Sequence, residues 1–271
     1  MKNTLLTTVS LWSAALRAVC GGGGGDDAAG GGSSGGGSPE GVYGGTYDKP
    51  GSTIFRMAIL DGNQFWMVYG NDGPSGFIAE GLVQGTGTAT SFANVLSFSS
   101  SARDFSNSVF TNAALSSSYT VGASSKTING TVTVTGNPTA INFNGGAVPG
   151  SAFSYSTAAS LATVQGNWEV TGLQNDDYDL VVAGNGSFTA TPTDGDPMTT
   201  PDAGCNFTGN FTPRASGKNV FDVAVTTGAG CALVGQALSG AAIAYPLNAG
   251  GTQLILGVSN TNLAAVVTGK K

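Results

Sequence analysis

The chain has 271 residues, of which only 10% are charged, and its formal net charge at pH 7 is −6. This acidic balance argues against nucleic-acid binding, which needs basic patches to displace counterions. The chain contains no histidine, so Ser-His-Asp and Cys-His catalysis and imidazole metal ligands are excluded. Abundant Gly, Ser, Thr and Asn instead indicate an exported β-protein, and no motif calls for a cofactor.

An apolar N-terminal segment predicts an export signal over residues 1–19. Residues 5–16 are apolar apart from scattered Ser and Thr, which is the length of a signal core and too short to span a bilayer. Ser13-Ala14-Ala15 fits an ordinary signal-peptidase site. A secreted or periplasmic chain is therefore one alternative.

Cys20 follows this segment directly. The order of Leu16, Ala18 and Cys20 resembles the acylation signal of bacterial lipoproteins. That family normally has a small residue just before the cysteine and an aliphatic residue three before it, where this chain has Val19 and Arg17. The resemblance implies that Cys20 is lipidated.

A Gly/Ser-rich tract at residues 20–39 predicts a flexible tether behind this cysteine. Acyl chains on Cys20 would attach the chain to a membrane, with each buried methylene contributing roughly 0.8 kcal/mol. Gly21, rather than aspartate, follows the cysteine, and by the sorting rule of lipoproteins this implies the outer membrane.

Beyond the tether, alternation of apolar and polar residues predicts strands and almost no helix. Turn sequences at residues 61–63, 136–138 and 216–217 separate them. Residues 64–69 are unusually apolar and predict a strand buried on both faces. Strands are expected at residues 55–59, 64–69, 76–85, 128–134, 141–143, 207–212, 221–225, 254–258 and 263–268.

The spacing predicts an all-β, antiparallel chain with two domains. We expect an irregular β-sandwich-like domain at residues 40–158, followed by a small up-and-down β-barrel of about eight strands at residues 159–271. Residues 40–46 and 165–171 echo each other, because both place a glycine two positions before an aromatic residue on a first strand.

The layout of cysteine, glycine-rich tether, β-rich first half and barrel second half resembles the Gram-negative surface lipoproteins of the transferrin-binding-protein-B and factor-H-binding-protein type. Residues 204–209, 212–214 and 219–223 are also similar to glycine-tethered lipoproteins of β-proteobacteria, a group without an assigned activity. The first resemblance implies display of β-domains for binding another protein, and neither implies functional residues.

Two cysteines, Cys205 and Cys231, remain after Cys20. In an exported chain such a pair predicts a disulfide, with two buried thiols as the alternative. The bridge would close a loop of about 26 residues and stabilise the fold by roughly 3 kcal/mol.

Acidic clusters offer few metal ligands. Asp176, Asp177 and Asp179 are a weak candidate calcium site, because Ca²⁺ prefers carboxylate oxygens, but such an acidic run is usually a solvated turn. Residues 194–197 predict another tight turn. The sequence therefore assigns no metal site.

Arg103 and Arg214 stand out in a chain poor in basic residues, and they are candidate ligand-binding residues. The main interpretation is that each forms an ion pair or caps carbonyl groups. A set of aromatic residues either lines a ligand cavity or, as we expect, fills the cores: Phe65, Trp66, Tyr69 and Trp168.

These observations predict a lipid-anchored, surface-exposed envelope protein that binds a host or envelope protein without catalysis. One alternative is a small-ligand carrier with a lipocalin-like cavity, and another is an exported enzyme that uses carboxylates. An integral outer-membrane barrel is disfavoured, since such barrels generally end in an aromatic residue and this sequence ends in Gly269-Lys270-Lys271.

Overall fold

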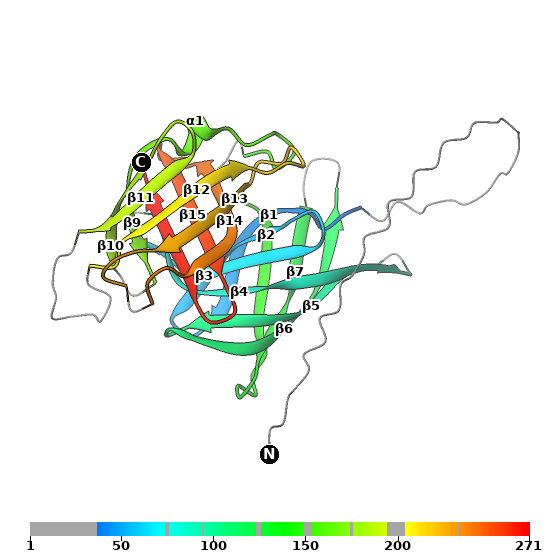
Figure 1. Cartoon of the computed structure of the whole chain (residues 1–271). Coiled ribbons are helices and arrows are strands. Elements are labelled where there is room, and N and C mark those ends of the chain that lie inside the picture. Colours follow the sequence, from blue (N-terminus) through cyan, green and yellow to red (C-terminus); the bar gives the residue numbers. More distant parts are fainter. Residues whose placement is uncertain are drawn as a thin grey trace, which may run out of the picture. The chain divides into compact units, whose positions relative to one another are not determined.

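The computed structural model describes residues 37–73, 76–93, 95–122, 126–148, 153–173, 176–193, 204–231 and 233–271. The predicted signal, Cys20, most of the predicted tether and the turn at residues 194–197 lie outside these segments. Within them, strands follow one another almost without interruption (Figure 1).

The strands of the first half are β1 (Gly41–Lys49), β2 (Ser52–Ile59), β3 (Gln64–Gly73), β4 (Gly76–Phe92), β5 (Val95–Ser106), β6 (Val109–Val121), β7 (Lys126–Val134) and β8 (Ile141–Ala147). Those of the second half are β9 (Gly166–Gly172), β10 (Asp177–Val182), β11 (Ser187–Pro192), β12 (Phe207–Pro213), β13 (Phe221–Thr227), β14 (Ala237–Pro246), β15 (Thr252–Ser259) and β16 (Ala264–Lys270).

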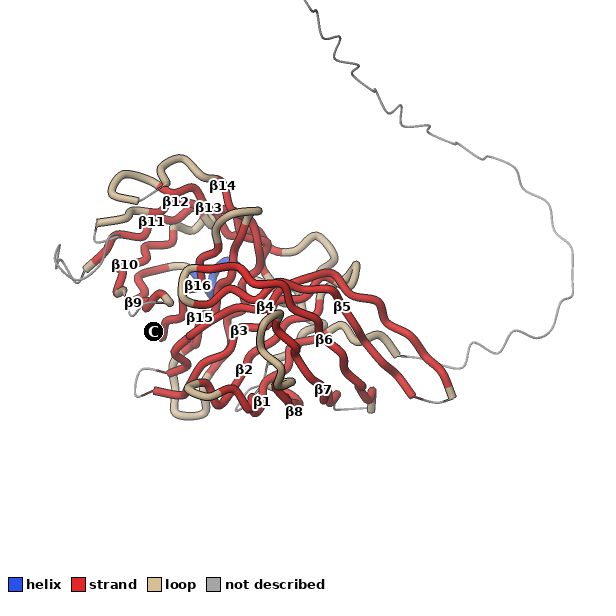
Figure 2. The backbone as a smooth tube through the Cα atoms, turned by 90° about the horizontal axis from the view of Figure 1, so that it is seen from below, coloured by secondary structure: helices blue, strands red, loops and turns tan. Residues whose placement is uncertain are grey.

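Each half is a closed antiparallel barrel of eight strands. Neighbours in sequence pair with one another, and the last strand of each half returns to the first, β8 to β1 and β16 to β9. Figure 2 shows strands over almost the whole described chain. The predicted all-β, antiparallel class and the eight-stranded C-terminal barrel are confirmed.

The N-terminal half differs from the irregular sandwich that the sequence predicted, because it is a closed barrel. Glycines make this closure possible. Gly44 and Gly45 of β1 lie opposite Gly146 and Gly145 of β8. A Cβ atom at Gly45 would lie only 2.0 Å from the backbone oxygen of Asn144, so a larger residue would force the two strands apart. Paired glycines carry no apolar alternation, which is why the sequence pattern concealed the closure.

The two barrels begin in the same way. Tyr43 on β1 and Trp168 on β9 are both buried in the core of their own barrel. Tyr43 Oη donates to the carbonyl oxygen of Pro39 (2.5 Å), and Trp168 Nε1 donates to that of Val164 (2.6 Å). Each aromatic residue therefore bonds to the backbone four residues before it. The sequence echo marks equivalent entry points, and its aromatic residues are core side chains.

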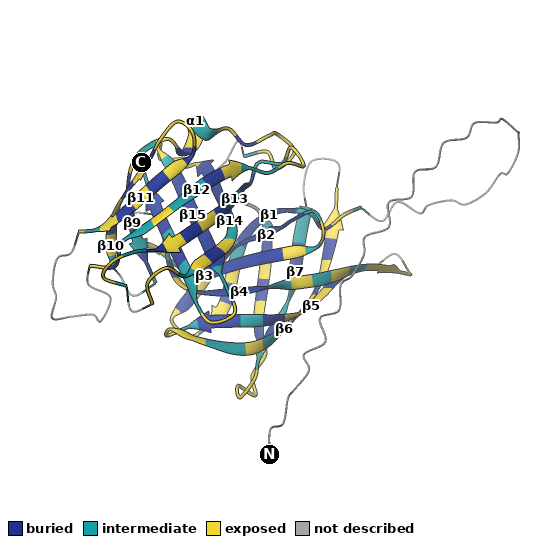
Figure 3. Ribbon diagram, viewed as in Figure 1, coloured by how far each residue is buried: buried dark blue, intermediate teal, exposed yellow. Residues whose placement is uncertain are grey.

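Several strands are buried on both faces because the two barrels pack against each other (Figure 3). On β3, Phe65 lies in the core of the first barrel, whereas Trp66 and Val68 lie in a third cluster between the barrels. On β15, Leu254 and Ile255 divide in the same way. Residues 65–69 are thus buried on both faces, as the prediction for residues 64–69 required, whereas Gln64 at the start of the run is exposed. The neighbouring barrel provides the second cover.

We call this third cluster the seam. Its buried members are Val42, Ala58, Leu60, Trp66, Val68, Phe77, Ala79, Leu82, Phe105 and Val148 from the first half, and Val220, Ala241, Ile243, Tyr245, Ile255 and Val266 from the second.

One short helix, α1 (Leu161–Val164), precedes the second barrel. In the part of the chain that the structure describes, no helix has the length and apolar character needed to cross a membrane.

Candidate functional site

The interiors of both barrels are filled by their own side chains. In the first barrel, Phe65 and Phe98 pack edge to face, with ring centroids 6.0 Å apart. In the second, an apolar cavity lined by the inward-facing side chains has a volume of about 30 Å³. Ligand pockets usually enclose roughly 300–1,000 Å³. This volume is too small for the lipocalin-like cavity that the sequence left open as an alternative for the second barrel. The aromatic set predicted from the sequence is buried in the cores and the seam.

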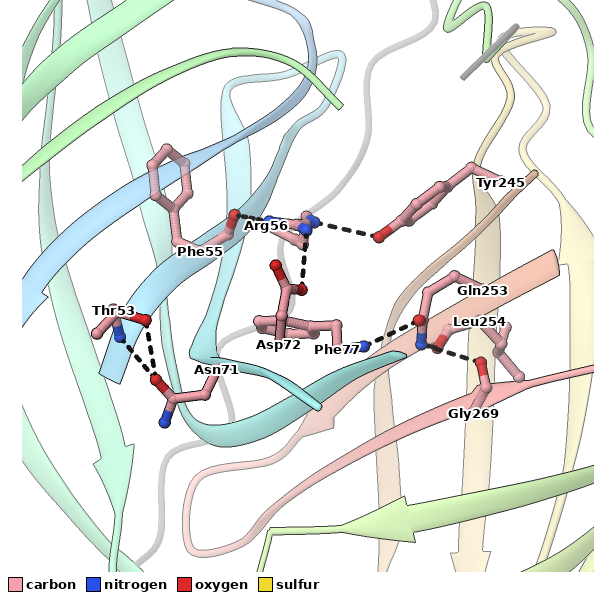
Figure 4. A network of polar contacts seen from close by, with 10 residues as sticks. All are labelled: Thr53, Phe55, Arg56, Asn71, Asp72, Phe77, Tyr245, Gln253, Leu254 and Gly269. Atoms are coloured by element: carbon pink, nitrogen blue, oxygen red, sulfur yellow. Dashed lines mark hydrogen bonds and ion pairs between the residues drawn. The ribbon is translucent and has the colours of Figure 1, made fainter. Parts of the chain in front are cut away.

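The seam contains polar groups that join the barrels (Figure 4). Arg56 on β2 is buried, and its Nε atom donates to Tyr245 Oη of the second barrel (3.1 Å). Its Nη1 atom donates to the carbonyl oxygen of Phe55 (2.9 Å), and Nη2 lies 3.6 Å from Asp72 Oδ1. The guanidinium group is thus satisfied from both barrels.

Gln253 on β15 makes the second connection in Figure 4. Its side chain is only 1% exposed. Oε1 accepts a hydrogen bond from the backbone N–H of Phe77 in the first barrel (3.0 Å), while Nε2 donates to the carbonyl oxygens of Leu254 (3.2 Å) and Gly269 (2.9 Å). This amide therefore holds the beginning of β4 against the second barrel.

Arg103, one of the two predicted ligand-binding arginines, contacts the second barrel. It donates to the carbonyl oxygens of Asn260 and Thr261 (both 2.9 Å), and its guanidinium carbon lies 4.0 Å from the ring centroid of Phe110. These contacts correspond to the carbonyl cap that was the main interpretation.

Arg214, the other predicted arginine, sits between two carboxylates. Its Nε atom bonds to Asp61 of the first barrel and its Nη1 atom to Asp222 of the second. The hydrogen bond from Arg214 holds the pKa of the Asp61 carboxyl below its usual value. Both arginines therefore link the barrels, and a role in ligand binding stays a prediction.

A cleft of about 370 Å³ opens beside the seam, and both barrels line it. We call it the seam cleft. Its lining residues are 78–80, Phe105, Asn107 and Ser108 of the first barrel and Gly172, Leu173, Asp176, Tyr178, Cys205, Phe207 and 264–267 of the second. Its charged lining side chains, Glu80 and Asp176, are both acidic. The volume is at the lower end of the range for binding pockets.

A buried polar cluster lies inside the first barrel, near Glu80 of the seam cleft. Lys49 Nζ donates to Tyr69 Oη (2.5 Å), and Tyr69 Oη donates to Asp104 Oδ1 (2.8 Å). Ser106 Oγ donates to the other carboxylate oxygen of Asp104 (3.1 Å). Asp104 is 4% exposed. The cluster thus supplies hydrogen bonds to both oxygens of a buried carboxylate.

Electrostatics indicate a structural role for this cluster. Burial lowers the pKa of the Lys49 ammonium, and the carboxylates of Asp104 and Glu80 oppose that change. Burial raises the pKa of the Tyr69 phenol, and Asp104 raises it further. Tyr69 therefore keeps its proton at neutral pH and acts as a donor, which a nucleophile or general base does not do.

The candidate calcium ligands do not come together. Asp177 and Asp179 are exposed on β10, and Asp176 lies just before that strand. Thr171 Oγ1 donates to Asp177 Oδ1 (2.9 Å). Among the residues with described positions, no three His, Cys, Asp or Glu side chains gather in a way that could hold a metal ion.

Cys205 and Cys231 form a disulfide, which confirms the predicted pairing. The bridge joins the segment before β12 to the loop between β13 and β14. Because Cys205 also lines the seam cleft, the bridge fixes one wall of that cleft.

The sequence did not single out Arg56, Gln253 or Lys49. Arg56 and Gln253 lie on the outward faces of β2 and β15. A polar residue there is normally solvated, so nothing in the alternation shows that a second barrel covers it. The burial of Asp104 could have been predicted from the sequence, because Asp104 continues the alternating inward-facing positions of Phe98 and Ala102 on β5. A carboxylate at such a position predicts a buried partner.

Comparisons with known proteins add little. No protein-family model matches the chain. No curated protein matches it either. Among solved structures, the chain is similar to Aeromonas veronii immune modulator A, with 12% sequence identity over 87% of this chain and 95% of that chain, and with a TM-score of 0.32. At that TM-score the likeness supports no conclusion about fold or function.

Proposed function

We propose that this chain is a lipid-anchored envelope protein that presents two packed β-barrels to a protein partner and performs no catalysis. In this proposal Cys20 is acylated after export and residues 21–36 connect it to the barrels. The outer membrane is the proposed location, and the partner is a host protein or another envelope protein.

The filled interior of the second barrel is the observation that carries this proposal. A cavity of about 30 Å³ holds no ligand of metabolite size, so recognition falls to the outer surface. The absence of histidine in the chain and the protonated phenol of Tyr69 favour binding over catalysis.

The seam cleft is the proposed contact site for the partner. Both barrels contribute to it, and the buried seam fixes their walls relative to each other. Its aromatic side chains include Phe105 and Phe207, and its charged ones are the acidic Glu80 and Asp176. This combination suits a partner loop that carries an apolar side chain next to a lysine or arginine.

Cell fractionation tests the anchoring part. The wild-type chain is expected to float with outer membranes on a density gradient, whereas the Cys20→Ser variant is expected in the soluble fraction. The Cys205→Ser/Cys231→Ser variant is the matched control, because it also loses cysteines but should still float. A wild-type chain that stays soluble would refute anchoring.

Site-specific photo-cross-linking tests the binding part. A photoreactive residue replaces Asn107 in the seam cleft or, as a control, Asn142, which is exposed on β8 outside the cleft. Exposure to envelope proteins, and separately to host serum proteins, should give one defined adduct at position 107 and none at position 142. Equal labelling at both positions would reject the cleft as the contact site.

A further inference from the structure

The hairpin of β4 and β5 extends beyond the first barrel. Strand β3 pairs with β4 only as far as Gln64 opposite Thr86, whereas the pairing of β4 with β5 continues to Phe92 opposite Val95. Residues 88–92 therefore have a strand neighbour on one side only, over a length of roughly 17 Å. Figure 1 shows this hairpin projecting past its neighbours.

The end of this hairpin is apolar and exposed. Phe92 is 85% exposed and Val95, directly opposite, is 57% exposed. Val121, at the end of β6, is exposed as well. Residues 81–102 and 105–125 contain no charged side chain. The hydroxyl groups along these strands are compatible with both water and lipid headgroups, and the lack of charges avoids the cost of bringing them into a bilayer interface.

The chain enters the first barrel at this same end. Tyr119 on β6 donates from Oη to the carbonyl oxygen of Gly37 (3.0 Å), and Tyr119 pairs with Leu96, the neighbour of Val95. Lys126 Nζ donates to the carbonyl oxygen of Ser38 (3.0 Å). Residue 37 is thus held close to the apolar hairpin end.

The span expected for the residues between Cys20 and Gly37 is similar to the length by which the β4–β5 hairpin extends beyond the first barrel. Sixteen residues, positions 21–36, separate Cys20 from Gly37. A Gly/Ser-rich chain of that length has a root-mean-square span of roughly 22 Å. A bilayer that holds acyl chains on Cys20 would therefore lie within reach of Phe92 and Val95.

We propose that the β4–β5 hairpin end, Phe92 with Val95, inserts into the interface of the bilayer that anchors Cys20 and so orients the barrels on the membrane. This inference rests on the proposed anchoring. The net charge of −6 and the uncharged hairpin indicate a neutral, zwitterionic lipid surface as the occupant.

Tryptophan fluorescence in vesicles tests the insertion. The full-length mature protein, purified from membranes, is reconstituted into phosphatidylcholine vesicles with brominated acyl chains, which quench nearby indoles. Phe92→Trp is compared with Val109→Trp. Val109 is 60% exposed and lies beside Ser106, at the opposite end of β5. Trp66 and Trp168 are buried and provide a constant background.

The F92W variant should lose a large part of its added fluorescence to the brominated lipid, because its indole would lie at the boundary of headgroups and acyl chains, and the V109W variant should lose none. Equal quenching of the two variants, or no quenching of F92W in protein that floats with the vesicles, would overturn the inference. So would an F92W emission shift that depends on protein concentration without vesicles, since the hairpin would then contact a second copy. Wild-type protein that does not float would instead refute the proposed anchoring.

Discussion

Replacing Gln253 with alanine tests the packing of the two barrels most sharply. The change removes the acceptor of the Phe77 N–H group, together with two donated hydrogen bonds, from a side chain that is 1% exposed. An unsatisfied buried N–H costs about 1–3 kcal/mol, and the lost methylene and amide leave a void. We expect the free energy of unfolding to fall by about 3 kcal/mol.

Equilibrium denaturation in guanidinium chloride measures this loss. Gln253→Met keeps the volume without the hydrogen bonds, so it should retain the part of the stability that comes from packing and lose about 2 kcal/mol. Gln64→Ala makes the same truncation at an exposed position of β3 and should change stability by less than about 0.5 kcal/mol. If Q253A and Q64A unfold at the same midpoint, the hydrogen bond between Gln253 and Phe77 contributes nothing to the packing of the barrels.

Three further predictions concern the same barrels. Burial raises the pKa of the Tyr69 phenol. The contribution of this phenol to the free energy of unfolding is therefore complete below about pH 10 and declines above it by about 1.4 kcal/mol per pH unit. Denaturation midpoints that stay constant between about pH 9 and pH 11 would contradict this prediction. The Cys205→Ser/Cys231→Ser variant should lose about 3 kcal/mol in denaturant, and an unchanged midpoint would show that the bridge is dispensable. Gly257→Ala, whose added Cβ would lie 3.5 Å from its nearest neighbours, should be neutral or gain about 0.5 kcal/mol. In Gly81→Ala the added Cβ would lie 2.2 Å from the Tyr69 ring, so this variant should lose about 2 kcal/mol of stability. Thermal unfolding in which Gly257→Ala is the less stable of the two variants would contradict this prediction.

Local patterns predicted much of the fold because strands and turns depend on neighbouring residues. The turn at residues 61–63 forms as expected, with positive φ angles at Gly62 and Asn63. The apolar run is buried on both faces from Phe65 to Tyr69, and only its first residue, Gln64, is exposed. The prediction of about eight strands in residues 159–271 is also confirmed, by β9 to β16.

Properties that depend on distant segments were harder to predict. Closure of the first barrel rests on Gly45 meeting Gly145, and glycine pairs leave no hydrophobic signal. Arg103 and Arg214 were recognisable as unusual, but their partners in the other barrel lie more than 150 residues away in sequence. The polar groups of the seam, such as Gln253, gain their importance only from the second barrel that covers them.

Mass spectrometry of the mature protein tests the central claim most directly. The first residue should be Cys20, and it should carry fatty acyl chains. The measured mass should therefore exceed the mass calculated for the unmodified sequence from residue 20 onward. An unmodified first residue at any position upstream or downstream of 20 would contradict the proposed anchor and, with it, the orientation of the hairpin toward the bilayer.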